Sequence, residues 1–126
     1  MARPLVGPLR CALLAAALCL CGSPAFAAAD YKIVTANEKG TYFAIGADLA
    51  KFVAPDATIN LEVLPTAGSA ANIKHLRYDP GVKFAIVQAD VYQAFIDRAA
   101  GGSAEAATII RPLRVILPLY NTEIHY

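Results

Sequence analysis

The residues of this chain that could do chemistry lie in the turns that follow its apolar, β-branched stretches. They share a polar, small or amphipathic side chain, and in order they are Thr35, Glu38, Gly40, Thr41, Tyr42, Thr66, Gly68, Ser69, Asn72, Gln88, Asp90, Tyr120 and Glu123. Three of these turns lead into helical patterns, and the N–H groups that open a helix bind small anions. In an open α/β sheet, ligands bind beyond the carboxyl ends of the strands. The pattern therefore predicts a small-anion site at that edge of a sheet.

Several of these residues also have a purely structural interpretation. Thr41, Ser69 and Asp90 could serve only as helix caps, a role that is compatible with ligand binding at the same helix end. Tyr120 could belong to the core, with its hydroxyl at the rim. Gln88 ends an apolar strand pattern, so we expect its amide to be partly buried and to need hydrogen-bond partners.

No pattern of a catalytic or cofactor site accompanies these turns. The sequence has no GxGxxG, Walker or GxSxG motif. His75 is expected on a solvated helix face, and neither it nor His125 has metal-ligand spacing. Ser69 and His75 would lie about 9 Å apart along one helix, too far for the direct hydrogen bond of a triad with Asp90. We therefore predict a protein that is not an enzyme and holds neither a metal nor a cofactor.

The elements that must position these turns alternate between strand and helix patterns. Strand patterns are expected at 31–35, 58–64, 82–88 and 113–117, and helices at 41–53, 70–78 and 91–100, with a short helix at 104–110. Gly40 is free to take a positive φ in the first turn, and Asp79-Pro80-Gly81 is a strong turn signal. The order β-α-β-α-β-α-β predicts an α/β fold with a mainly parallel sheet flanked by helices.

The first 27 residues have the pattern of a secretory signal peptide. Arg3 and Arg10 form a basic start, an apolar run covers 11–21, and 25–27 reads Ala-Phe-Ala, an A-x-A cleavage site. An uncleaved anchor fits less well because the run is shorter than the 20 or so residues that span a bilayer. A lipoprotein signal ending at Cys21 is an alternative, although Leu20 is larger than lipoprotein processing prefers. We expect export to the periplasm.

Removing this leader changes the composition of the remaining chain, 28–126. All three cysteines lie in the leader, so the exported part would depend on an apolar core rather than disulfides. Nine Lys and Arg then face 10 Asp and Glu, because two of the 11 basic residues are in the leader. A net charge near −1 with no basic patch makes nucleic acid an improbable partner. The last residues alternate like a strand that is just beginning, so we expect the chain to stop within a fold.

Four motifs in register carry a resemblance to a known family. They are TAxxxGTY over 35–42 with Gly46, TxGSxxN over 66–72, IVQAD over 86–90 and LYxxE over 119–123. In order and spacing they resemble the TAXI group of extracytoplasmic solute-binding proteins, which feed TRAP-type secondary transporters.

This resemblance implies a two-lobed, type II periplasmic-binding fold, of which 28–126 would be the N-terminal ligand-binding lobe. It implies a small anionic solute, such as an amino acid of the glutamate type or a dicarboxylate. The partners would be the membrane permease subunits of a TRAP-type transporter, and the protein would be a monomer. The ligand-binding residues carried over by position are Gly40, Thr41, Tyr42, Ser69, Ala70 through its N–H, Gln88, Asp90 and Tyr120.

The chain departs from the family pattern at two positions and in length. Lys39 and Ala67 stand where the family often has glycine, so a cation is added near the first turn and the second turn is more restricted. Members of the group are about twice as long, so the resemblance implies that 28–126 corresponds to only one of the two lobes. Three other interpretations remain: a periplasmic sensing module that signals to a membrane partner, a fragment without function of its own, and, least favoured, an exported enzyme.

Overall fold

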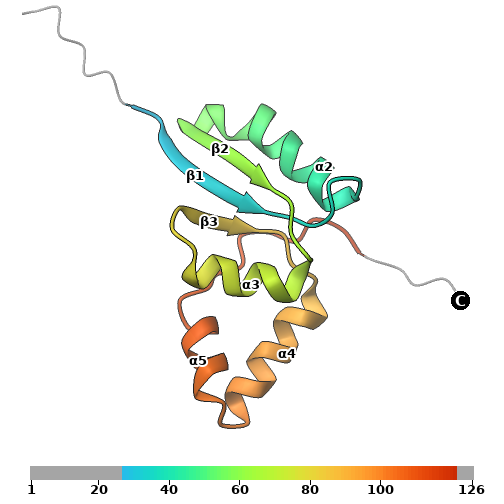
Figure 1. Cartoon of the computed structure of the whole chain (residues 1–126), viewed down its shortest axis with the longest axis vertical. Coiled ribbons are helices and arrows are strands. Elements are labelled where there is room, and N and C mark those ends of the chain that lie inside the picture. The colour runs from blue at the N-terminus through green and yellow to red at the C-terminus, as the bar shows by residue number, and fades with distance from the viewer. Residues whose placement is uncertain (1–26, 122–126) are drawn as a thin grey trace, which may run out of the picture.

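The computed structural model describes residues 27–121 (Figure 1). Its elements are β1 (Ala29–Val34), α2 (Thr41–Asp48), η1 (Leu49–Val53), η2 (Pro55–Ala57), β2 (Ile59–Leu64), α3 (Ser69–Tyr78), β3 (Val82–Ala85), α4 (Ala89–Ala100) and α5 (Ala104–Ile110). All but the last residue of the predicted signal peptide lies outside the described residues, as does Glu123. Within 27–121, no helix has the length and apolar character needed to cross a membrane.

A parallel sheet forms the centre of the described chain, with the strand order β2-β1-β3. β1 pairs with β2 in unbroken register from Ala29 opposite Ile59 to Val34 opposite Leu64. β1 also pairs with β3 in parallel, with one irregularity between Lys32 and Ile33. The predicted α/β class and the parallel pairing are confirmed. Consecutive strands are joined by helical crossovers, which parallel strands require.

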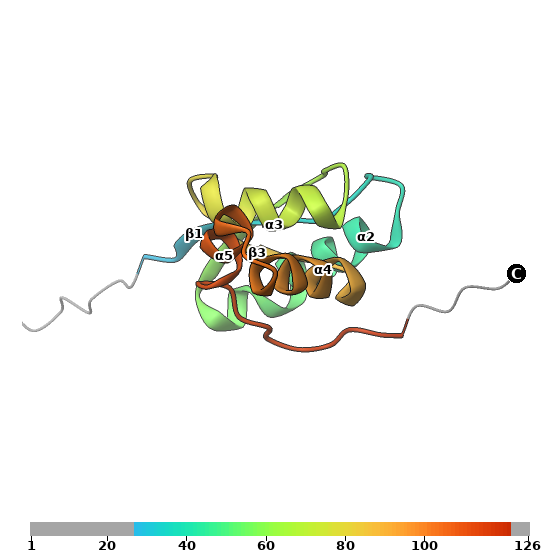
Figure 2. The ribbon, with the colours of Figure 1, turned by 90° about the horizontal axis from the view of Figure 1, so that it is seen from below.

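The helices cover both faces of this sheet. The segment from α2 to η2 packs against β2, whereas α3 packs against β3 and β1 on the other face (Figure 2). Right-handed crossovers give this result, because the connection from β1 to β2 runs to one side of β1 and the connection from β2 to β3 passes back over β1. Beyond α3, a cluster of Ile73, Phe95 and Ile109 joins α3, α4 and α5 into a second layer of core.

The first predicted helix is interrupted. α2 ends at Asp48, and η1 continues it as a π-helical turn in which the Ala54 N–H donates to Leu49 O at 2.9 Å. The predicted helix ends before Pro55, as expected, and Pro55 begins a separate short 3₁₀ turn. Gly46 lies buried where α2 crosses the sheet, and a Cβ there would be 2.6 Å from Thr35 Cγ2. Glycine therefore allows the close approach of α2 to β1 and β2.

The predicted strand at 82–88 is three residues shorter in the structure. The Ile86 N–H still donates to Val34 O, but β3 ends at Ala85. The next polar groups are bonded to α3 instead, because Ile86 O accepts from the Asn72 side chain and the Gln88 N–H donates to Ser69 Oγ. The turn at 79–81 is confirmed: Gly81 has φ +80° and the Val82 N–H donates to Asp79 O.

The prediction of a fourth strand at 113–117 is wrong for the described chain. The described sheet has three strands, and 113–121 belongs to none of them. Val115 and Ile116 are 70% and 73% exposed, so their apolar alternation faces solvent rather than a second layer. The free edge of β3 is only four residues long, and Pro112 and Pro118 supply no N–H groups. The short edge and the missing donors leave little for a fourth strand to pair with.

Candidate functional site

Three helices begin at the carboxyl edge of the sheet. Because β1, β2 and β3 are parallel, the turns that follow them bring the first residues of α2, α3 and α4 to the same edge. The first N–H groups of these helices that donate to a backbone carbonyl of the first turn belong to Ala44, Asn72 and Tyr92. The N–H groups that precede them have no carbonyl partner within their own helix. These groups and the helix dipoles favour negative charge at this edge.

An open hollow of about 500 Å³ lies between the first and second turns. Its lining residues are Asn37, Glu38, Lys39, Pro65 and Thr66. The first turn is held by Asn37, whose Oδ1 accepts from the Lys39 N–H at 2.9 Å and whose carbonyl accepts from the Gly40 N–H at 2.8 Å. The lining therefore presents one cation and one carboxylate from adjacent exposed residues.

The second turn contains a backbone conformation that only glycine adopts without strain. Gly68 precedes α3 with φ +112° and ψ −167°, a region that residues with a Cβ rarely enter. A Cβ at this position would meet nothing within 4 Å, so the restriction comes from the backbone alone. Gly40 behaves differently, since its φ is −95° and its backbone is extended. The prediction that Gly40 takes a positive φ is wrong, and Gly68 in the second turn supplies that conformation.

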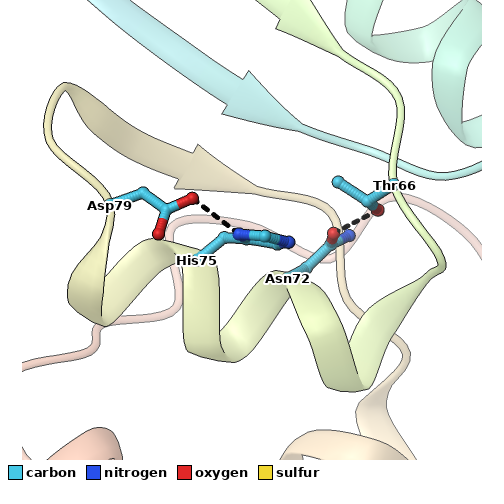
Figure 3. Close-up of polar contacts among 4 residues, drawn as sticks. All are labelled: Thr66, Asn72, His75 and Asp79. Carbon is cyan, nitrogen blue, oxygen red and sulfur yellow. Dashed lines mark hydrogen bonds and ion pairs between the residues drawn. The ribbon is translucent and has the colours of Figure 1, made fainter.

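The side chain of Asn72, in the first helical turn of α3, is bonded to all three turns, and Figure 3 shows its contact with Thr66. It is fully buried, and its Nδ2 donates to Thr35 O, just after β1, and to Ile86 O, just after β3, at 2.8 Å for the latter. Its Oδ1 lies 2.5 Å from Thr66 Oγ1 in the second turn. Every polar atom of this amide therefore has a partner.

Two further contacts complete this network. Thr66 Oγ1 accepts from the Gly68 N–H at 3.2 Å and lies 3.1 Å from Thr35 O, so its single proton has two acceptors within reach. Ser69 Oγ accepts from the Gln88 N–H at 2.9 Å and so ties the start of α3 to the start of α4. Thr35 itself is fully buried and donates from Oγ1 to Leu64 O. The turns are thus fixed to one another by side chains rather than by the sheet alone.

The residues predicted as caps lie inside their helices. Thr41 and Ser69 are the first residues of α2 and α3, and the cap positions before them are glycines without side-chain hydrogen bonds. Asp90 is the second residue of α4, where its Oδ1 accepts from the Val91 N–H at 2.8 Å. The capping interpretation is therefore wrong for Thr41 and Ser69, and Asp90 partly neutralises the N-terminus of α4 from within the first turn.

The predicted ligand-binding residues lie at the starts of α2, α3 and α4 and in the segment that follows α5. Gly40, Thr41 and Tyr42 open α2, Ser69 and Ala70 open α3, and Gln88 and Asp90 flank the start of α4. The ring of Tyr120 packs edge-on against Tyr42 at 6.3 Å between centroids, so the segment 113–121 returns to the first turn. Tyr120 is half-exposed and not a core residue.

Gln88 differs from its prediction. Its side chain is exposed, and its backbone N–H rather than its amide is bonded to Ser69. The cause is the early end of β3, which makes Gln88 the residue before α4 instead of the last residue of a strand.

The sequence reasoning singled out Asn72 as a polar strand-end residue but gave it no role, and it missed Asn37 and Pro65. The TxGSxxN spacing was the available signal for Asn72, because it places Thr66 and Asn72 on either side of one turn. His75, one turn further along α3, pairs through Nδ1 with Asp79 Oδ2 at 2.6 Å and is partly exposed (Figure 3). Among residues 27–121, no cluster of three or more His, Cys, Asp or Glu side chains is arranged to hold a metal ion.

Comparison with known families shows to which family the chain belongs. The sequence model of the NMT1-like family matches residues 33–126, which is most of the chain and includes all three turns. The chain belongs to the NMT1-like family. This family is of the periplasmic-binding type, so its members are solute-binding proteins in general terms, in agreement with the α/β lobe described above. No curated protein and no solved structure matches the chain.

Proposed function

We propose that this NMT1-like protein is an extracytoplasmic solute-binding protein of the TAXI type. It binds a small anionic solute at the carboxyl edge of its sheet and delivers it to the permease subunits of a TRAP-type transporter. The protein performs no catalysis and acts in the periplasm, after cleavage of the leader at 1–27. The family membership supports solute binding in general, and the motifs quoted above support the narrower assignment.

The observation that carries this proposal is the convergence of three helix N-termini next to the open hollow. The backbone N–H groups at the starts of α2 and α3 can donate to a carboxylate, and charge-assisted hydrogen bonds of this kind are stronger than neutral ones. Lys39, which lines the hollow and is exposed, adds a positive charge there. An anion can therefore be bound by donors from two turns that the Asn72 network holds in place.

The acidic side chains at the same edge favour an amino acid over a dicarboxylate. Asp90 lies in the first turn of α4 and Glu38 lines the hollow, and both are exposed. A ligand with two carboxylates and no positive charge would be repelled by both acids, whereas the α-ammonium group of an amino acid would be attracted to them. We therefore assign a solute of the glutamate type, with a carboxylate at the starts of α2 and α3 and its ammonium toward the acids.

Thermal unfolding of the full chain with matched probes tests this function. L-glutamate and 2-oxoglutarate differ at the α-carbon, where one carries an ammonium and the other a keto group; succinate and L-glutamine complete the set. At 10 mM ligand and a dissociation constant of about 1 mM, binding to the folded state alone adds about 1.4 kcal/mol. For a domain of this size that raises the midpoint by roughly 5–10 °C.

The expected result is a shift with L-glutamate that exceeds the shift with 2-oxoglutarate. A larger shift with 2-oxoglutarate or succinate would overturn the assignment of the ammonium but keep the anion site. If no probe moves the midpoint of a cooperative transition, the carboxyl edge does not bind small acids.

A further inference from the structure

The first turn of α3 is bonded to each of the three turns at the carboxyl edge. Asn72 contacts Thr35 O after β1, Ile86 O after β3, and Thr66 in the turn after β2. These bonds lie at the topological switch point of the sheet. The helix after β1 covers one face and the helix after β2 covers the other, so the chain leaves β1 and β2 toward opposite faces. At such a point the strand ends separate, and their last carbonyl groups need partners other than a neighbouring strand.

We propose that Asn72 is the positioning residue of the solute site. It does not line the hollow, and being fully buried it acts only through the groups to which it is bonded. By joining the ends of β1 and β3 it sets how far apart the starts of α2 and α4 lie, and by holding Thr66 it fixes one wall of the hollow. The part of this proposal that concerns binding rests on the proposed function.

The chemistry of the site allows only an amide in this place and orientation. Two carbonyl oxygens face Nδ2, so a rotated amide would bring Oδ1 against both of them. Thr66 Oγ1 accepts from Gly68 and can donate its one proton to Oδ1, which fixes the other end of the amide. An aspartate has the same shape but, when ionised, only accepts hydrogen bonds, so its carboxylate would face two carbonyl oxygens without a donor.

Two variants of Asn72 and one control separate positioning from general stability. Asn72→Ala removes the amide, and Asn72→Asp keeps its shape but removes both donors. Ile109→Val is the control, because Ile109 is equally buried but belongs to the cluster of α3, α4 and α5. Hydrogen exchange of the full chain reports the amides of Gly68 and Gln88, which donate to Thr66 and Ser69 in the network.

We expect Asn72→Ala to raise exchange at Gly68 and Gln88 at least about tenfold relative to the core amides of α4. Ile109→Val should leave that ratio within about twofold of the parent chain. The proposal is overturned if Asn72→Ala raises exchange equally at the network and at α4, since the amide would then contribute only to overall stability.

The pH dependence of Asn72→Asp gives a second readout. Burial against two carbonyl oxygens raises the pKa of the introduced carboxyl above its unfolded value of about 3.9. The folded state then binds more protons than the unfolded state, so this variant gains stability as pH falls and loses it as pH rises through the raised pKa. From pH 7 to pH 5 its ratio of folded to unfolded molecules should rise by up to about tenfold per pH unit relative to the parent chain. A variant that follows the parent chain over this range would overturn the proposal.

Binding of L-glutamate supplies the third readout. If the parent chain binds it, Asn72→Ala should lose at least about tenfold in affinity while Ile109→Val stays within about twofold. Equal affinity in Asn72→Ala and the parent chain would overturn the positioning role. If none of the four probes shifts the midpoint of the parent chain, the proposed function fails, and the exchange ratio still decides whether Asn72 positions the turns.

Discussion

Substitution of Gly46 by alanine tests how closely α2 must approach the sheet. A Cβ at this position would lie 2.6 Å from Thr35 Cγ2 and 3.1 Å from Val63 Cγ1, and the first distance is shorter than real side chains tolerate. Thr35 cannot turn its methyl away freely, because it is fully buried and its Oγ1 donates to Leu64 O at 2.9 Å. Either α2 must move outward or Thr35 must give up this hydrogen bond.

The expected magnitude is the balance of two opposing effects. Alanine is favoured over glycine in a helix by about 1 kcal/mol. Overpacking of a buried site costs about 1–3 kcal/mol, and loss of the Thr35 hydrogen bond would add about 1 kcal/mol. We therefore expect Gly46→Ala to lower the free energy of unfolding by about 1–3 kcal/mol. For a domain of this size, this loss lowers the thermal midpoint by roughly 4–20 °C.

Urea and thermal denaturation of the parent chain, Gly46→Ala, Thr35→Ser and the double variant measure this effect. Thr35→Ser removes the clashing methyl and keeps the hydroxyl that donates to Leu64 O. The double variant should be more stable than the sum of the two single changes, with a coupling of about 0.5–3 kcal/mol. If Gly46→Ala is as stable as the parent chain, or if Thr35→Ser gives no rescue, the close approach is not what requires glycine here.

Three further predictions concern the turns and the second layer of core. Gly68→Ala should lower the free energy of unfolding by about 1–3 kcal/mol in denaturant titrations, because the cost lies in the backbone conformation alone. Lys39→Gln should weaken L-glutamate binding up to about fivefold in low-salt calorimetry, and the difference should vanish in 1 M salt because Lys39 is exposed. Ile109→Ala should destabilise the chain by about 2–5 kcal/mol, as judged by its thermal midpoint.

Each of these predictions has a result that contradicts it. Gly101→Ala serves as the matched control for Gly68→Ala, since its φ is not positive and the nearest atom to a new Cβ is 3.4 Å away. Equal stability of the two variants would contradict the strain at Gly68. For Lys39→Gln, a loss that persists in high salt would mean a direct contact rather than a screened attraction. For Ile109→Ala, a loss below about 1 kcal/mol would mean that the α3–α4–α5 cluster contributes little to the fold.

The local elements were predicted correctly where the apolar periodicity and the turn-forming residues indicated the same boundaries. The helix at 70–78 differs from α3 by one residue, and Asp79-Pro80-Gly81 forms the turn that its residue types indicate. The fourth strand at 113–117 failed because apolar alternation states only that a segment could be a strand. Whether Val115 and Ile116 join a sheet depends on a free edge of sufficient length and on a layer that covers them, and the described structure supplies neither.

Local sequence patterns were sufficient for the order of the first three strands and of the helices that follow them, for the parallel sheet and for the three polar turns at its carboxyl edge. These features follow from local patterns and from the handedness of the connections. Which polar residues face solvent and which hold the turns together depends on contacts between distant segments. Asn72 and Gln88 are both amides that the sequence places close to the turns at the carboxyl edge, yet one is fully buried with three partners and the other is exposed. The reason is that a polar side chain is buried only where hydrogen-bond partners surround it. The partners of Asn72 come from segments distant in the sequence, so a local pattern does not contain them.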